Sequence, residues 1–296
     1  MTAVPAPIRC SVAAEAAGDP LEGTAPPAQQ WFLVEHPGPW AARALTGSGI
    51  EPGAVAALSA WAGAVGGRIA LIRRPGRSSR VPRARRWFRV DSRPGHEAVR
   101  TGSFRDDGEL IAAVGSPGEP ADGPIALVCA HGRHDTCCAI RGRPLAGALA
   151  AALPDATWEC SHVGGCRFAP AMVLLPHGFT FGGVRPDEAA GIVRDYARGV
   201  LEPGRLRGRS SLPPPVQAAQ QHARTATGAT GVDALRVVAA DIDTGTDGEG
   251  GHRIEFADPS CRVRVRERIE QTDRALTCAT TAPARLRVFD LVDLQV

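Results

Sequence analysis

The hydrophobic and polar positions of this chain form short apolar runs that alternate with segments of helical spacing. In the N-terminal part the pattern predicts strands at 31–35, 68–73 and 86–91, with helices at 52–65 and from Asp106 onward. The residues before them, 1–30, are rich in Ala, Gly and Pro and predict an irregular lead-in. Alternating helices and strands of this kind predict an α/β layer structure.

A second set of elements follows a Pro- and Gly-rich stretch at 115–124, which marks a predicted domain boundary. The pattern predicts strands at 125–129 and 156–160 around a helix at 145–153, then strands at 172–175 and 179–182 and a helix at 186–200. This β-α-β, β-β-α order is that of a thioredoxin-like domain. It places Cys129 at the end of the first strand and His162 and Cys166 just after the second, so these side chains can meet at one end of a sheet.

The remaining residues predict a linker at 201–213, a helix at 214–225 and a β-meander built from segments at 235–239, 252–256, 261–266 and 286–292. The acidic loop 241–249 mimics a calcium loop but lacks the final Glu of an EF-hand, and we interpret it as a hairpin turn. The predicted domains are an N-terminal α/β domain (1–118), a thioredoxin-like ferredoxin domain (119–203) and a small α+β appendage (204–296). A degenerate thioredoxin-like fold is the alternative description of the first domain.

Composition adds two constraints. Hydrophobic residues make up 44% of the 296 residues, and no run of about 18 apolar residues is present to span a bilayer, so we expect no membrane association. All 34 basic residues are arginine and the net charge is only +3, so arginine runs carry little functional weight here. The run at 73–86 has no interleaved aromatics for stacking on bases, and we expect a solvated hairpin loop there rather than a nucleic-acid site. Docking of an acidic redox partner is the functional alternative for this run.

Cysteine and histidine are concentrated in one part of the chain: five of the eight cysteines and three of the eight histidines lie between Cys129 and Cys166. Thiolates and imidazoles are the ligands of iron–sulfur clusters, zinc and copper, so the segment predicts a metal or iron–sulfur centre. The alternatives are structural, either small buried thiols or disulfides in a secreted chain. The first residues, 1–7, lack the features of a signal peptide, and we therefore expect reduced thiols and a cytoplasmic location.

Several motifs together resemble the sucrase/ferredoxin-like family, which overlaps the thioredoxin-like [2Fe-2S] ferredoxins. The central motifs are Cys129-x-His-Gly-Arg-x-Asp-x-Cys137-Cys138 and Trp158-Glu-Cys-Ser-His162-x-Gly-Gly-x-Arg-Phe-Ala169. Further matching stretches are Gly142-Arg-Pro-Leu145, Leu174-Leu-Pro-x-Gly178, Trp31-Phe-Leu-Val-Glu35, His36-Pro-Gly-Pro-Trp40 and Arg207-Gly-Arg-Ser-Ser211. The resemblance covers most of the chain, and its central motifs are long enough to be specific.

The resemblance implies a ligand set of two cysteines nine positions apart and two histidines in a His-x-x-x-His segment. Carried over by position, these are Cys129, Cys138 and His162, whereas the fourth position holds Cys166 in place of histidine. This departure leaves open whether the fourth ligand follows the family pattern. The preferred set for cluster and metal binding is Cys129, Cys138, His162 and Cys166, with Cys137 and Cys160 as the alternatives.

The residues around the motifs support this choice. The turn Val163-Gly164-Gly165 lets the chain double back and present Cys166 to the same centre as His162. Adjacent cysteines normally point apart, so one member of the Cys137 and Cys138 pair is expected outside the ligand set. We expect the loop histidines, His131 and His134, to form hydrogen bonds rather than to bind metal. We expect the nearby arginines to offset the negative charge of the centre; these are Arg133, Arg141, Arg143 and Arg167.

The function that the resemblance implies is electron transfer or redox sensing with one [2Fe-2S] cluster, served by a redox partner such as a reductase or a ferredoxin-type donor. We expect an electron carrier rather than a stand-alone enzyme, no nucleic-acid partner, and an N-terminal half that acts as scaffold or docking surface. A zinc-stabilised Cys3His binding module and a thiol oxidoreductase remain as alternatives, although the chain has no Cys-x-x-Cys. A glycosidase needs a pair of carboxylates at a sugar site, and the sequence singles out no such pair.

Overall fold

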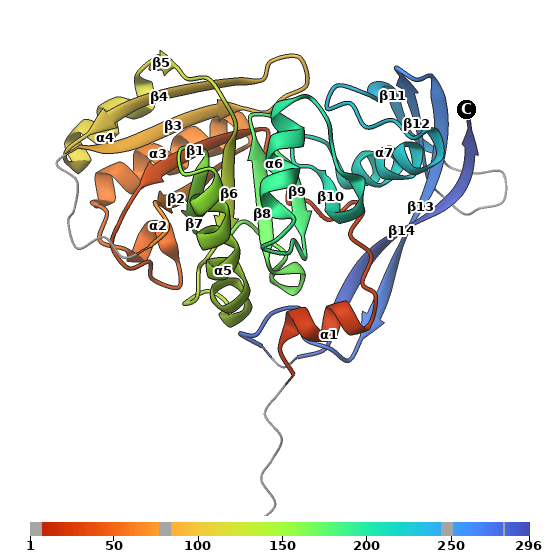
Figure 1. Cartoon of the computed structure of the whole chain (residues 1–296), viewed down its shortest axis with the longest axis horizontal. Coiled ribbons are helices and arrows are strands. Elements are labelled where there is room, and N and C mark those ends of the chain that lie inside the picture. The colour runs from red at the N-terminus through yellow and green to blue at the C-terminus, as the bar shows by residue number, and fades with distance from the viewer. Residues whose placement is uncertain (1–7, 77–83, 244–250, 281) are drawn as a thin grey trace, which may run out of the picture.

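The computed structural model describes residues 8–76, 84–243, 251–280 and 282–296. In these residues a large mixed sheet is packed with helices, and a smaller antiparallel sheet lies beside it (Figure 1). This is the α/β architecture that the hydrophobic pattern predicted. No helix in the described ranges has both the length and the apolar character that a membrane crossing requires.

The N-terminal unit forms half of the large sheet. Its strands lie in the order β2-β1-β3-β4-β5, with β1 parallel to β2 and antiparallel to β3. Its elements are β1 (Gln30–Glu35), α2 (Ala44–Gly47), α3 (Pro52–Val65), β2 (Gly67–Arg73), β3 (Arg85–Asp91), β4 (Ala98–Phe104), α4 (Asp107–Gly115) and β5 (Glu119–Pro120). The sequence pattern did not predict β4. The lead-in was predicted to be irregular, which was wrong for the short helix α1 (Cys10–Ala16).

The second unit forms the other half of the sheet. Its elements are β6 (Ile125–Cys129), α5 (Thr136–Ala152), β7 (Thr157–Cys160), η1 (Cys166–Phe168), β8 (Ala171–Leu175), β9 (Phe179–Gly182) and α6 (Ala189–Ala197). The strand order is β9-β8-β6-β7, with β6 parallel to β7 and antiparallel to β8. This order and these directions are those of a thioredoxin-like domain.

The two units share one ten-stranded sheet because β2 pairs with β7 in antiparallel fashion, through Ile72 with Cys160 and Arg73 with Glu159. One hydrophobic core covers a face of both units and includes Trp31, Phe88 and Trp158. The sheet thus continues across the proposed boundary near residue 118, and the division into three domains stays a prediction.

Two connections differ from the expectations. The strand β10 (Leu206–Arg209) pairs with β9, so the interpretation of 201–213 as a linker was wrong for these residues. The strands β2 and β3 are separated in the sheet by β1, so these two strands do not pair as the expected hairpin. At its start Arg74 donates to the carbonyl oxygens of Pro154 and Thr157, at 2.7 and 2.9 Å. Residues 77–83 of that segment lie outside the described residues.

The small sheet is the predicted β-meander. Its four antiparallel strands follow chain order, and α7 (Pro214–Thr227) packs against them. The strands are β11 (Arg236–Asp243), β12 (Gly251–Ala257), β13 (Cys261–Thr272) and β14 (Ala284–Gln295), and a short turn, η2 (Pro203–Arg205), precedes β10. The predicted hairpin turn at 241–249 falls largely on residues 244–250, outside the described ranges.

Candidate metal centre

The first ligand segment runs from the end of β6 into the first turn of α5. Asp135 caps this helix, because its Oδ1 accepts a hydrogen bond from the backbone nitrogen of Cys137 at 2.8 Å. The helix therefore begins at Thr136 and not at Leu145, the predicted start, and Pro144 lies inside it. As a consequence, Cys137 and Cys138 lie at a helix N-terminus, where the helix dipole favours thiolates.

A glycine allows this helix to approach the strand closely. A Cβ atom at Gly142 would lie 2.0 Å from the carbonyl oxygen of Cys129, at the end of β6. No side chain larger than hydrogen fits there unless helix and strand move apart. Gly142 thus sets the spacing between the strand that carries Cys129 and the helix that carries Cys138.

The second ligand segment is the turn that follows β7. Gly164 and Gly165 adopt positive φ angles of 94° and 76°, and the chain then enters η1 at Cys166. The buried guanidinium of Arg207 holds this turn by donating to the carbonyl oxygen of Gly164 at 3.1 Å and to Oγ1 of Thr24 at 3.1 Å. The doubling back of the chain at this turn was predicted, but the role of Arg207 was not.

The fold brings the four predicted ligands together. Donor atoms of Cys129, Cys138 and His162 lie within 4.8 Å of one another. Cys166 joins them through two further groups with the same limit, one with His134 and His162 and one with Asp135 and Cys138. Its Sγ atom lies 3.5 Å from Nδ1 of His162. The assignment of these residues as ligands remains a prediction.

The thiols perturb one another's protonation. The Cys138 thiol contacts both neighbouring sulfurs: its interaction with Cys129 holds the pKa of Cys129 well below its ordinary value, and its interaction with Cys166 lowers the pKa of Cys166 to about 7. The same contacts with Cys129 and Cys166, together with burial, raise the pKa of Cys138. Binding of a metal by Cys138 would therefore release its proton.

His162 is the charged partner of these thiolates. Burial opposes its protonation, but hydrogen bonds and charge interactions with Cys129 and Cys166 outweigh burial and raise its pKa to about 9. The charged form of His162 and the thiolate forms of Cys129 and Cys166 thus stabilise one another. A metal ion bound here would replace the proton of the His162 imidazolium as the positive charge that balances the thiolates.

The two loop histidines have different roles. His131 is buried and uses both ring nitrogens: Nε2 donates to the carbonyl oxygen of Ala41 at 2.7 Å, and Nδ1 accepts from the backbone nitrogen of His162 at 3.2 Å. It positions His162, in keeping with the expectation that it forms hydrogen bonds in the loop. The ring of His134 stacks on that of His162 at a centroid distance of 3.8 Å, and one of its nitrogens is close enough to be a further donor.

The two alternative cysteines lie in different surroundings. Cys160 is fully buried beside Cys129 in the parallel pair of β6 and β7, and burial raises its pKa. Within the described residues it belongs to no group of metal-ligand atoms. Cys137 points into a second group, with Cys10, Asp135 and Cys278, which shares only Asp135 with the groups around Cys138 and Cys166. The adjacent cysteines thus serve different groups, as their positions in the sequence suggested.

Positive charge reaches the centre from a residue that the sequence reasoning missed. Nη2 of Arg68, in β2, donates to the carbonyl oxygen of His162 at 3.2 Å; burial lowers the pKa of Arg68, and the charges of Cys160 and Cys129 oppose that change. Two of the arginines predicted to offset charge form ion pairs with acidic residues near α1: Arg141 with Glu15 at 2.9 Å and Arg167 with Asp19 at 3.2 Å. The other two, Arg133 and Arg143, are exposed.

A pocket of about 260 Å³ gives the centre access to solvent. His131, His134 and His162 line it together with residues of the N-terminal unit, including Arg43 and Leu71. The N-terminal unit therefore contributes to the wall of the site. Its own strands carry no cysteine.

The donor chemistry fits an iron–sulfur cluster, and it fits zinc as well. Three thiols and one imidazole converge from two segments at the end of one sheet. Cys3His is an established set for structural zinc, and mixed Cys and His ligation also occurs in [2Fe-2S] centres. The geometry supports a metal site here.

Comparison with known proteins yields a family and no individual relative. The family described as sucrase/ferredoxin-like matches residues 21–208, which include both halves of the large sheet and all four predicted ligands. No curated protein matches the chain, and no solved structure matches it. Since the family match covers more than half of the sequence, the chain belongs to the sucrase/ferredoxin-like family.

Proposed function

We propose that this chain binds one [2Fe-2S] cluster through Cys129, Cys138, His162 and Cys166 and acts as an electron carrier or redox sensor. The observation that carries the proposal is the convergence of these four donors in overlapping groups within 4.8 Å at the end of a thioredoxin-like sheet. When bound, such a cluster accepts and returns an electron.

The ligand charge suggests the range of the potential. Three thiolates and one imidazole carry less negative charge than four thiolates and more than two thiolates with two imidazoles. Replacement of thiolate by imidazole raises the reduction potential, so we expect a value between those of four-cysteine and two-histidine centres. Arg68 places a positive charge beside Cys129 and favours the added electron.

His162 can couple a proton to that electron. Its backbone is held by His131 and Arg68, so the ring has a defined place between the thiols and the pocket. The ring nitrogen of His162 that does not bind metal can exchange a proton with solvent through this pocket. An electron-rich centre raises the affinity of that nitrogen for its proton.

The pocket also suggests where a partner docks. Arg43 lines it and the exposed Arg133 belongs to the first ligand loop, so the rim near His162 is basic. A redox protein with an acidic surface, such as a reductase or ferredoxin-type donor, would be attracted there. The proposal requires neither a nucleic acid nor a membrane.

The test is purification of the full chain without oxygen, followed by measurement of iron, acid-labile sulfide, zinc and the visible spectrum. We expect a red-brown protein with about two iron atoms per chain and an electron paramagnetic resonance signal after reduction. A colourless, iron-free protein whose zinc is lost in Cys129→Ser would show the zinc-stabilised module instead and contradict the proposal.

A further inference from the structure

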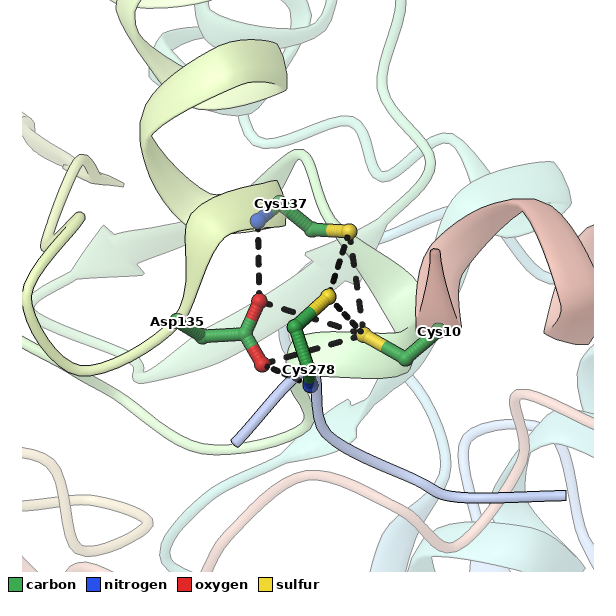
Figure 2. Close-up of side chains that lie close together, drawn as sticks. All are labelled: Cys10, Asp135, Cys137 and Cys278. Atoms are coloured by element: carbon green, nitrogen blue, oxygen red, sulfur yellow. Dashed lines mark hydrogen bonds between the residues drawn. The ribbon is translucent and has the colours of Figure 1, made fainter. Parts of the chain in front are cut away.

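The structure contains a second cluster of metal-ligand side chains, distinct in its cysteines from the first. It consists of Cys10, Cys137, Cys278 and Asp135, whose donor atoms all lie within 4.8 Å of one another (Figure 2). We propose that these residues form a structural zinc site that ties the N-terminal helix and the tip of the β13–β14 hairpin to the first ligand loop.

The spacing of the sulfur atoms fits a tetrahedral ion. The Sγ atoms of Cys10, Cys137 and Cys278 are 3.3, 3.5 and 3.7 Å apart. A zinc ion with Zn–S bonds of about 2.3 Å separates two tetrahedral thiolates by about 3.8 Å. A small outward movement of the three side chains would therefore complete the sulfur face of the site.

Asp135 supplies the fourth donor. Its two carboxylate oxygens lie 3.7 and 3.9 Å from Sγ of Cys10, close to the separation of about 3.5 Å expected for a thiolate and a carboxylate on one zinc. Each oxygen also accepts a backbone hydrogen bond, from Cys137 at 2.8 Å and from Cys278 at 2.7 Å. These bonds orient the carboxylate in the way that outer partners orient a metal ligand.

The surroundings are not those of ordinary core cysteines. Asp135 is 2% exposed and Cys137 is fully buried, yet a carboxylate faces three thiols there, whereas a core thiol normally packs among apolar atoms. Cys278 is exposed, and together with Cys10 it borders a pocket of about 550 Å³, which leaves a path for an ion to enter. Binding would release the thiol protons.

The site would join segments that are far apart in the chain. Cys10 begins α1, Cys137 lies in the first turn of α5, and Cys278 lies between β13 and β14. Figure 1 shows α1 beside the far end of the β13–β14 hairpin. An ion pair between Nη2 of Arg274 and Oδ1 of Asp19, 2.5 Å apart, also holds the residues that follow α1 to the residues that follow β13. Zinc bound here would act as a cross-link between the first and last parts of the fold.

The experiment measures zinc, iron and sulfide in the full chain purified without oxygen from zinc-supplemented medium. The variants are Cys10→Ser and Cys278→Ser, and the control is Cys261→Ser, which alters a buried thiol in the core of the small sheet. We expect about one zinc per wild-type chain. Cys10→Ser and Cys278→Ser should lose this zinc, whereas Cys261→Ser should keep it. All three variants should keep the wild-type content of iron and sulfide.

A second readout separates a zinc site from a merely packed thiol. Amide hydrogen exchange in 10–16 and 271–280 should become faster in Cys278→Ser, and zinc chloride should slow exchange in metal-depleted wild type but not in that variant. Three results would each overturn the proposal. They are zinc retained by both Cys10→Ser and Cys278→Ser, zinc lost from Cys129→Ser alone, and a disulfide among Cys10, Cys137 and Cys278 in wild type. The iron content reports on the first centre independently of these results.

Discussion

The two halves of the large sheet have the same strand arrangement but different chemistry at their strand ends. In the N-terminal unit β1 lies between a parallel β2 and an antiparallel β3, as β6 lies between β7 and β8 in the second unit. However, β1 ends at Glu35, whereas β6 ends at Cys129. The topology thus provides a place for a centre, and the donors at the strand ends decide whether one can form.

The connections after these strands differ as well. Residues 36–51 separate β1 from α3, whereas only residues 130–135 separate β6 from α5. The shorter connection and the close approach at Gly142 bring the first turn of α5 next to Cys129. In the N-terminal unit the long connection instead reaches across to the second unit, where the carbonyl oxygen of Ala41 accepts a hydrogen bond from His131. The half whose described strands carry no cysteine thereby supports the half that holds the proposed cluster ligands.

The largest effect is expected when the second unit loses one of its thiolate donors, at the end of β6 or in the first turn of α5. Its site then comes to resemble the end of β1, which carries no cysteine. Cys129→Ser and Cys138→Ser should each reduce iron from about two atoms per chain to nearly none, because each removes a thiolate from the proposed set. Iron and sulfide analysis after anaerobic purification checks this, with Cys261→Ser as the control. Full iron content in Cys138→Ser would move the assignment to Cys137.

The close contact between helix and strand can be tested without touching a ligand. Gly142→Ala places a Cβ 2.0 Å from the carbonyl oxygen of Cys129, so we expect a loss of about 1–3 kcal/mol in the free energy of unfolding and weaker retention of iron. Gly147→Ala in the same helix meets nothing within 4 Å and should stabilise the protein by about 0.5–1 kcal/mol. Denaturant unfolding of both variants measures the difference, and equal stabilities would contradict it.

The fourth ligand can be tested by moving the site toward the two-histidine pattern. Cys166→His should keep a cluster and raise the reduction potential, by on the order of 100 mV, because an imidazole replaces a negative thiolate. Cys166→Ala should make the cluster labile. Spectroelectrochemistry measures both outcomes. If the Ala variant kept its spectrum and potential, Cys166 would be an unliganded neighbour of the cluster.

The smallest predicted effect concerns protons. Reduction should raise the pKa of the free ring nitrogen of His162, so the reduced form binds a proton more tightly and the potential falls as pH rises. The slope should approach about 59 mV per pH unit between the pKa values of the oxidised and reduced forms. Potentials measured across the neutral to alkaline range check this. A flat profile would show that His162 does not exchange protons with the pocket.

Metal-free protein offers a related test of the same histidine. Its pKa is raised from 6.5 to about 9 by the thiolates of Cys129 and Cys166 against the opposing effect of burial. The charged ring therefore contributes stability that is fully present below pH 6.5 and is lost as the pH rises through about 9. The stability difference between wild type and His162→Gln should shrink over that window in thermal unfolding. A difference that does not change with pH would contradict the ion pair.

The sequence by itself determined much of this protein. Apolar runs located β6, β8 and β9 nearly to the residue because short buried strands leave a strong local signal. The α/β class, the meander at the C-terminal end and the family followed from periodicity and motifs. The clustering of cysteine and histidine between Cys129 and Cys166 marked the region of the candidate metal centre, since ligand chemistry depends on residue type.

Only the tertiary structure decided how these parts meet. The start of α5 depends on the cap at Asp135, and the merger of two units into one sheet depends on the pairing of β2 with β7, neither of which a local apolar pattern reveals. The same holds for Cys10 and Cys278, which lie 268 positions apart with their Sγ atoms 3.5 Å from each other. Periodicity reports which face of an element is buried, whereas contacts between distant segments arise only when the packed elements bring those faces together.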